Sequence, residues 1–527
     1  MDRDRTIWIV LGALSLGAIL LFAAMAVGML LLGGGMESSW PPLFYSLRVT
    51  LFTIGQALAS TALSVILALP VALAIARRAD FPGRSLLLGL MLLPLGLPVL
   101  PAVFGIVEIW GRQGLVNDLF RLVGLTDVVS IYGLTGILIG HVFFNLPLAA
   151  RLMVRAIDHV PRNEWWLAAG LDFPRSALFR VVEWPALVRI IPGAAGLIFM
   201  LSVTSFTIIL TLGGGPQTST LEVAIYQALK FEYDPPRALA LSALQLALTL
   251  LVFLFLRLFP DPEQDRGAVE GRAFRMDGRS GLSKLSDGLM LLAFLLFIGP
   301  PIAAIIAGGL KADLARLISD PLFQQALLTS LTIAIAAGLG SVFLTFFMAR
   351  ARLVLGEQGI AGLFRLPEFM LLVPPLALGS GWFILLLRTG GDSNAAIPIV
   401  VIINMLMAMP FTARVIGPEL KTHLLRTSRL ADSLDINGIG RVRLIDWPVL
   451  RAPLLTALSF AMALSLGDMG AIALFGSEDF ITLPSLLYAK LGSYRATDAA
   501  GLALILGALC LVLMLPAVRS DRVREMP

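Results

Sequence analysis

Long runs of apolar residues recur along the whole chain, and they restrict its fold more than any other feature. A helix that spans a bilayer needs roughly 20 apolar residues, and the sequence contains about twelve runs of this kind. Only 14% of the 527 residues are charged, whereas globular chains have about 25%. We therefore expect an all-α polytopic membrane protein of about 12 transmembrane helices, with little chain left for a soluble catalytic domain.

The first apolar run could also belong to a signal peptide. It is far longer than the apolar region of such a peptide, which has about 7 to 15 residues, so we expect it to be retained as a span. The expected spans are 7–32, 49–76, 86–109, 133–157, 190–212, 238–259, 288–309, 328–349, 366–387, 395–417, 453–475 and 499–518.

Basic residues collect in alternate loops between these spans. Of the 40 Lys and Arg, about 30 fall on the side that holds the N-terminus and about 10 on the other. The positive-inside rule makes the richer side cytoplasmic, so both termini are predicted to be cytoplasmic. The net charge of +5 is then a product of loop asymmetry, and it gives no reason to expect nucleic-acid binding.

The six spans before residue 260 align with the six after residue 287 at an offset of about 263 residues. Glu183-Trp-Pro falls on Asp446-Trp-Pro, and Asp172 falls on Asp435, inside polar loops where shared apolar composition cannot produce the match. Two homologous six-helix halves with a pathway between them are therefore expected. The predicted division is a first transmembrane permease domain at 1–259, a cytoplasmic linker at 260–287 and a second transmembrane permease domain at 288–527.

The sequence contains few residues suited to disulfide bonding, metal binding or nucleotide binding. Cys510 is the only cysteine, and His141, His159 and His423 are widely separated, so we expect neither a disulfide framework nor a metal site. No Gly-x-x-x-x-Gly-Lys-Ser/Thr string occurs, so the chain lacks the phosphate cradle of a P-loop ATPase. We expect no enzyme activity and no cofactor.

Two long basic loops, 162–187 and 426–450, follow the fourth span of each half. Each is predicted to form a short amphipathic helix, a turn at Phe173-Pro174 or Asn437-Gly438, and a second helix that leads into Trp-Pro. Such a helix could lie on the bilayer surface. Duplication at matching positions favours two docking sites for two copies of one partner.

These loops resemble those of permease subunits of ATP-binding-cassette importers, whose signature is a cytoplasmic Glu-Ala-Ala, Gly and Pro loop that docks on the ATPase. Four further strings, 182–185, 210–229, 467–484 and 491–495, carry a closer resemblance. Through them the chain is most similar, within that family, to the fused-duplicate permeases of thiamine and thiamine-pyrophosphate importers. The resemblance implies a bacterial inner-membrane location, two copies of a cytoplasmic ATPase that hydrolyses ATP, and a periplasmic thiamine-binding protein.

Carried over to this sequence, the family signature implies ATPase docking through matching positions of the two loops. Asp172 and Asp435 stand where the family has Gly, which puts the turn in question, although Asp tolerates a left-handed backbone better than most residues. Trp166 and Arg429 stand where the family has Glu. The docking positions are Ala168, Leu171, Asp172, Phe179 and Pro185 in the first loop, and Ala431, Leu434, Asp435, Val442 and Pro448 in the second.

Asp468 is a carboxylate inside the eleventh span, where central placement costs about 2.5 to 3.5 kcal/mol. Its aligned position in the first half is Ser205, next to Thr204. In one interpretation these three residues line the translocation pathway, and Asp468 helps a cationic thiazolium to pass. In the other, Asp468 caps a half-helix at a break in the span.

Other polar features within the spans have simpler interpretations. His141, Asn145 and Asn404 are expected to form hydrogen bonds between helices. The Gly213–Pro216 string is expected to end the fifth span, or to form part of a periplasmic gate.

Three other functions have less support in the sequence. A ferric-iron type importer permease has a similar fused architecture, but lacks the thiamine-type strings. A major-facilitator transporter also has twelve spans, and Asp80-Phe-Pro-Gly-Arg84 partly matches its loop motif; the paired long loops argue against it. A channel or lipid scramblase has no positive feature here. Which form of thiamine is preferred stays open.

Overall fold

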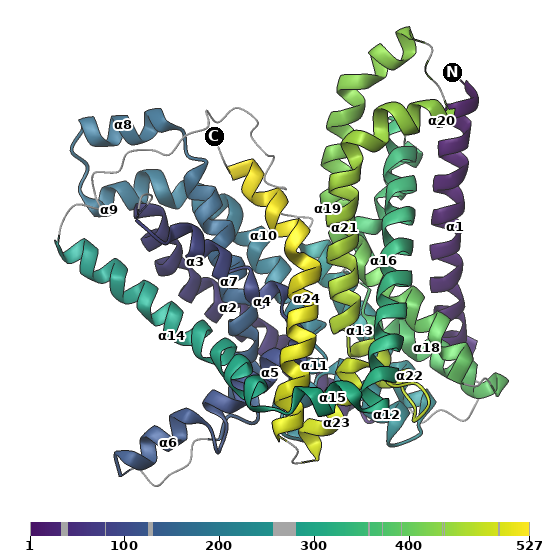
Figure 1. The fold of residues 1–527 in the computed structure, drawn as a ribbon, viewed down its shortest axis with the longest axis horizontal. Coiled ribbons are helices and arrows are strands. Elements are labelled where there is room, and N and C mark those ends of the chain that lie inside the picture. Colours follow the sequence, from purple (N-terminus) through teal and green to yellow (C-terminus); the bar gives the residue numbers. More distant parts are fainter. Residues whose placement is uncertain are drawn as a thin grey trace.

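The structure is a bundle of helices that are long and apolar enough to cross a membrane (Figure 1). Among the residues that the structure describes, eleven helices meet this criterion, and Pro375–Thr389 is a shorter apolar helix. Each overlaps one expected span, so the all-α fold with about twelve spans is confirmed. The computed structural model describes residues 2–32, 41–78, 81–124, 130–256, 281–356, 359–370, 373–390, 393–434, 436, 438–493 and 496–525.

The described helices divide between the two halves. The first half contains α1 (Asp2–Leu32), α2 (Leu43–Arg77), α3 (Arg84–Leu90), α4 (Leu93–Gly96), α5 (Val99–Trp110), α6 (Leu115–Leu122), α7 (Leu134–Asp158), α8 (Arg162–Gly170), α9 (Arg175–Leu178), α10 (Trp184–Val203), α11 (Thr207–Leu212), α12 (Leu221–Lys230) and α13 (Pro235–Leu256). The second half contains α14 (Gly281–Lys311), α15 (Leu314–Ser319), α16 (Pro321–Leu355), α17 (Leu366–Phe369), α18 (Pro375–Thr389), α19 (Ser393–Ser433), α20 (Gly438–Arg441), α21 (Trp447–Gly467), α22 (Gly470–Phe475), α23 (Leu483–Gly492) and α24 (Ala496–Glu525).

Several expected spans are interrupted. The third is divided into α3, α4 and α5, where Pro94 and Pro98 cannot continue a helix from the preceding turn. The fifth breaks between α10 and α11, and the eleventh breaks at Asp468 between α21 and α22. Helix α14 begins at Gly281, so the last residues of the expected linker are helical; residues 257–280 lie outside the described part of the chain.

Short elements recur at matching positions in the two halves. Single π-helical turns, Phe179–Glu183 and Val442–Asp446, precede the two Trp-Pro pairs, each five residues long. Helices α11 and α22 have six residues each, and α12 and α23 have ten each. The structure therefore shows the sequence repeat as repeated geometry.

The first span of each half packs on the other half. Helix α1 contacts α16 and α18, while α14 contacts α2 and α5. Both crossings depend on a glycine: a Cβ on Gly381 would lie 2.3 Å from the Ala26 carbonyl oxygen, and one on Gly105 would lie 2.3 Å from the Pro301 carbonyl oxygen. The largest buried core accordingly combines side chains from both halves.

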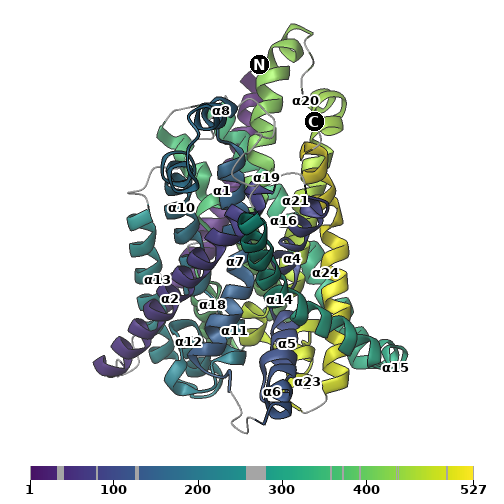
Figure 2. The same ribbon diagram turned by 90° about the vertical axis from the view of Figure 1, so that its left-hand side faces the viewer.

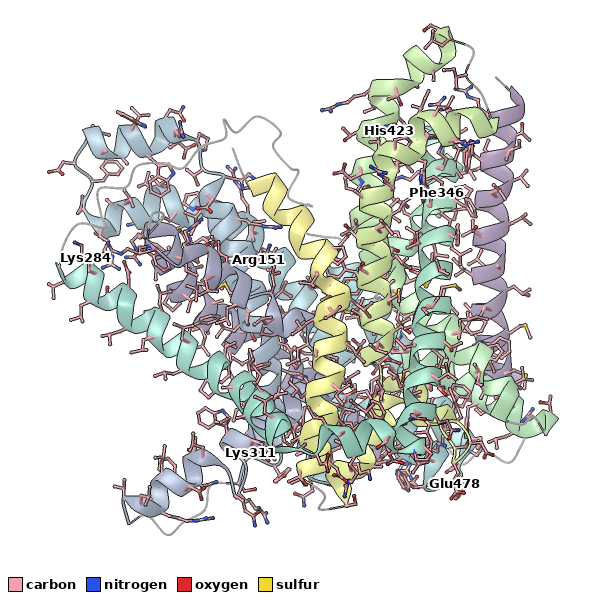
Figure 3. The ribbon with its side chains drawn as sticks, viewed as in Figure 1. Arg151, Lys284, Lys311, Phe346, His423 and Glu478 are labelled. Atoms are coloured by element: carbon pink, nitrogen blue, oxygen red, sulfur yellow. The ribbon has the colours of Figure 1, made fainter. Side chains whose placement is uncertain are left out.

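The two ends of the bundle differ. Both termini, α8 and α20 lie at one end, which we call the α8/α20 end, and α6, α12 and α23 lie at the opposite, α12/α23 end (Figures 1 and 2). Among the labelled side chains, His423 lies toward the first end and Lys311 and Glu478 toward the second (Figure 3). This arrangement places both long loops on the same side as the termini.

Candidate functional site

The first long loop folds as the sequence predicts, into α8, a turn and α9. Helix α8 ends where the Phe173 amide donates to the Ala168 carbonyl at 3.1 Å, which is the long bond of a Schellman turn. This turn needs a left-handed residue, and Asp172 supplies it with φ 51°. Asp therefore takes the backbone role of the family's glycine.

The second loop differs from the expected separate helix. Helix α19 runs unbroken for 41 residues, from the tenth span to Ser433, because no residue after Pro418 stops it before the turn. One hydrogen bond of the first turn recurs here, since the Ile436 amide donates to the Ala431 carbonyl at 3.0 Å. Asp435 and Asn437 lie outside the described residues.

The expected docking positions have matching exposures. Ala168 and Ala431 are buried, 1% and 0% exposed, and hold each turn against its own loop. Leu171 and Leu434 are 66% and 60% exposed and project away from it. Of the remaining positions, Phe179 is half-buried and Val442 is exposed, as are Pro185 and Pro448.

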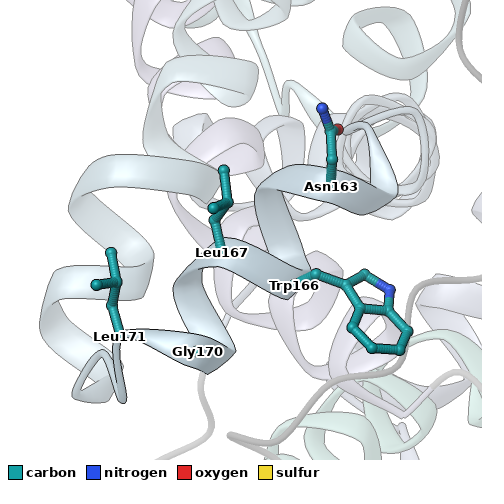
Figure 4. Close-up of a pocket in the computed structure, with 5 residues that line it drawn as sticks. All are labelled: Asn163, Trp166, Leu167, Gly170 and Leu171. Atoms are coloured by element: carbon teal, nitrogen blue, oxygen red, sulfur yellow. The ribbon is translucent and has the colours of Figure 1, made fainter.

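An apolar hollow of about 610 Å³ lies on the first loop. Exposed Trp166, Leu167 and Leu171 line it, together with Asn163 and Gly170 (Figure 4). Large apolar side chains gathered in one exposed patch are typical of interaction sites. Trp166, which replaces the signature Glu, is thus part of this surface.

Buried ion clusters lie behind both loops. Asp287 is within 2.9 Å of Arg78 and 3.4 Å of Arg77, and 3.9 Å from Arg175 of α9. It thereby connects the first loop to α2 and α14.

In the second half, Asp446 lies 2.8 Å from His423 Nε2 and 3.6 Å from Arg350. Its third neighbour is Arg441 of α20, at 3.9 Å. Both loops are therefore fixed to the ends of spanning helices, so that a displacement of a loop would be transmitted to the bundle.

The breaks in the fifth and eleventh spans lie at aligned positions. Thr204 and Ser205 lie between α10 and α11, and both are half-buried. Asp468 is half-buried at the second break, where its carboxylate accepts from the amides of Gly470 at 3.2 Å and Ala471 at 3.3 Å. Asp468 thus caps the half-helix α22, and this geometry is compatible with a place in the pathway as well.

The polar side chains within the spans connect helices, as the sequence predicts. His141 Nδ1 is 2.8 Å from Ser60 Oγ, the Asn145 amide donates to Ser202 Oγ at 3.5 Å, and the Asn404 amide donates to Ser465 Oγ at 3.0 Å. The Gly213–Pro216 string follows the end of α11 at Leu212, and ends that half-helix.

Sequence reasoning missed Glu222, which lies at the first turn of α12 and is fully buried. Its signal was present, because a carboxylate between Leu221 and Val223 interrupts an apolar string as Asp468 does.

The comparison with known proteins agrees with this geometry. No protein-family model matches the chain. The thiamine transport system permease protein ThiP of Brucella abortus (strain 2308) is 46% identical over 511 residues, which cover 97% of this chain and 93% of the relative. ThiP of Escherichia coli (strain K12) is 40% identical over 519 residues, 96% of this chain and 95% of the relative.

A shorter relative supports the wider grouping. The molybdenum transport system permease protein ModB of Mycobacterium bovis is 30% identical over 237 residues, which cover 43% of this chain and 87% of that protein. Nearly the whole of that permease thus aligns with less than half of the present chain. Given the full-length similarity to the two ThiP proteins, this chain belongs to the family of thiamine transport system permeases.

Proposed function

We propose that the chain is the permease of an ATP-driven importer of thiamine or its phosphates. The observation that carries this proposal is the 46% identity, over 97% of the chain, to a protein named as a thiamine transport permease. The paired loops, and the absence of a P-loop from the sequence, support a division of labour in which another subunit hydrolyses ATP.

Two copies of a cytoplasmic ATPase dock on the α8/α20 end. The exposed pair Leu171 and Leu434 supports this stoichiometry, because matching apolar side chains on two matching turns suit two identical partners. A periplasmic thiamine-binding protein delivers the substrate to the α12/α23 end. The binding protein would set most of the specificity.

Both termini face the cytoplasm of a bacterial cell, and the basic loops support this orientation. Reporter fusions after Glu232, Asp313 and Asp479 should therefore report the periplasm, and a fusion after Gly83 should report the cytoplasm. A cytoplasmic signal from any of the first three would contradict the proposed topology.

The halves act as two permease domains, 1–259 and 288–527, joined by the stretch 260–287, with the pathway between them. Asp468, Thr204 and Ser205 line it where the fifth and eleventh spans break. Broken spans expose backbone and polar groups at the depth where a substrate passes, and this supports the pathway role.

The direct test is transport by the full complex. The permease, its ATPase and its binding protein would be reconstituted into lipid vesicles, and uptake of labelled thiamine would be measured with and without ATP. Thiamine should accumulate only with ATP and the binding protein present. Accumulation of ferric iron or molybdate in place of thiamine would overturn the proposal.

A further inference from the structure

Two carboxylates from different halves meet near the α12/α23 end. Glu222 is on α12 and Asp468 caps α22, and these two helices are in contact. Burial raises the pKa of Glu222 well above its usual range, and the negative charge of Asp468 raises it further. Helix α12 is outside the twelve spans. The two acids are therefore close enough to interact across the interface between the halves.

The Glu222 carboxylate is fully buried and only partly satisfied. One oxygen, Oε1, is 3.5 Å from the Gln245 amide nitrogen. The other, Oε2, has no hydrogen-bond partner among the described residues, and neither has Gln245 Oε1. Buried acceptors of this kind are costly unless something supplies a donor or a positive charge.

No described basic side chain forms an ion pair with Glu222 or Asp468. The basic residue of α12, Lys230, is engaged elsewhere, because it donates to the Gly476 carbonyl at 3.1 Å and lies 5.7 Å from the Phe383 ring centroid. The Gly470 and Ala471 amides hold Asp468, and burial favours the protonated form of Glu222, so a cation that binds both carboxylates would have to come from outside the chain.

Aromatic residues lie on the same helix as Glu222 and in contact with it. Tyr226 lies one helical turn after Glu222, so both face the same side of α12. Its ring centroid is 5.3 Å from that of Phe206, at the first break. Tyr488, the repeat-related tyrosine of α23, is half-buried. Burial raises the pKa of Tyr226, and the ionised form of Tyr488 raises it further.

From this arrangement we propose that Glu222, Asp468, Tyr226 and Tyr488 form a binding site for a flat organic cation at the interface of the two halves. Aromatic faces attract such cations through their ring quadrupoles. A metal ion would be suited instead by a shell of many oxygens. If the proposed function holds, the group that binds here is the thiazolium ring of thiamine, and the permease itself recognises it.

Access to the site requires movement. Glu222 is fully buried, whereas Asp468, Tyr226 and Tyr488 are half-buried. Separation of α12 from α22 would expose both carboxylates to the substrate, and their return would remove the site and release the cation. The site is thus present only when the halves part at this end.

The first test measures thiamine uptake by the reconstituted complex. Glu222→Gln should lower uptake by about 30-fold, as expected when one partner of a buried charge pair is lost, and Asp468→Asn should act in the same direction. Glu222→Asp keeps the charge and should retain most of the uptake. The matched control, Glu478→Gln, removes an exposed charge near the same end and should have no effect.

The second test reads binding without transport. In a Cys510→Ala background, Ser205→Cys places one thiol beside Phe206, and its modification by a thiosulfonate reagent would be timed during ATP turnover. Thiamine should slow modification in the parent, but not when Glu222→Gln is added. An uncharged thiazole of the same substitution should not slow it.

The outcomes separate this inference from the proposed function. If the parent complex imports thiamine, but Glu222→Gln imports as fast and thiamine gives no protection, the site is wrong and the importer assignment stands. If the parent complex fails to import thiamine, the proposed function itself is wrong. Equal protection by the uncharged thiazole, or protection by sodium ions alone, would overturn recognition of an organic cation.

Discussion

Asp172 is the residue on which the turn after α8 depends. Its φ of 51° is left-handed, a conformation that costs an ordinary L-residue about 1 to 2 kcal/mol and costs a β-branched one more. Asp172→Val should therefore open the turn, while Asp172→Gly should preserve it.

The measurement is hydrogen exchange of the Phe173 amide, which donates to Ala168 in the intact turn. Asp172→Val should speed its exchange by about tenfold, the equivalent of about 1.4 kcal/mol, and reduce ATPase binding. Asp172→Gly should leave both near the parental level. Equal exchange in the two variants would mean that the left-handed residue does not determine the turn.

The sequence predicts the roles of some individual residues and not of others. Interhelical hydrogen bonds of Asn145 and Asn404 followed from polarity within apolar runs. Glu222 did not, because its importance comes from burial against Gln245 and from Asp468, which is 246 residues away in the chain. A contact of that separation has no local signal.

The turns after α8 and α19, where we propose that the ATPase docks, are the elements that should couple ATP hydrolysis to transport. Leu171→Glu and Leu434→Glu each put a charge on an exposed apolar side chain expected to enter the ATPase, and an unpaired buried charge costs several kcal/mol. The double variant should fail to co-purify with the ATPase, and uptake should fall at least about 100-fold. Binding of the periplasmic protein should be unchanged.

The control is Leu122→Glu on α6, where the side chain is 83% exposed at the opposite end of the molecule. It adds the same charge at a site that no ATPase contacts, and should preserve co-purification. Normal ATPase binding and uptake in the double Leu171/Leu434 variant would refute the docking proposal.

Element boundaries were predictable only where the sequence contains a residue that ends a helix or favours a turn, such as Pro or Gly. Helix α8 of the first long loop ends at a turn that Phe173-Pro174 predicts. Helix α19 instead continues into the second loop as one helix, because its residues are good helix formers as far as Ser433. The breaks at Ser205 and Asp468 lie within the expected spans 190–212 and 453–475. Hydropathy detects a span, but not an interruption within it.

At the scale of the whole molecule, the sequence does not predict that α1 and α14 each pack on helices of the other half. The repeat predicted two similar halves, but apolar helices carry little information about which neighbour they choose. The choice depends on close approaches, such as the one between Gly381 and Ala26. These are visible only once the helices are placed.

This exchange predicts that neither half is stable without the other. If the chain is divided between residues 270 and 271, each half alone should be degraded, because α1 then lacks α16 and α18 and α14 lacks α2 and α5. Expressed together, the halves should co-purify and support thiamine uptake.

Gly381→Val should weaken the association of the two halves by about tenfold, since overpacking costs about 1 to 3 kcal/mol and the added Cβ would lie 2.3 Å from the Ala26 oxygen. The matched control is Gly17→Val on α1, where an added Cβ meets nothing within 4 Å. Should Gly381→Val associate as well as Gly17→Val, the crossing of α1 over α18 would not hold the halves together.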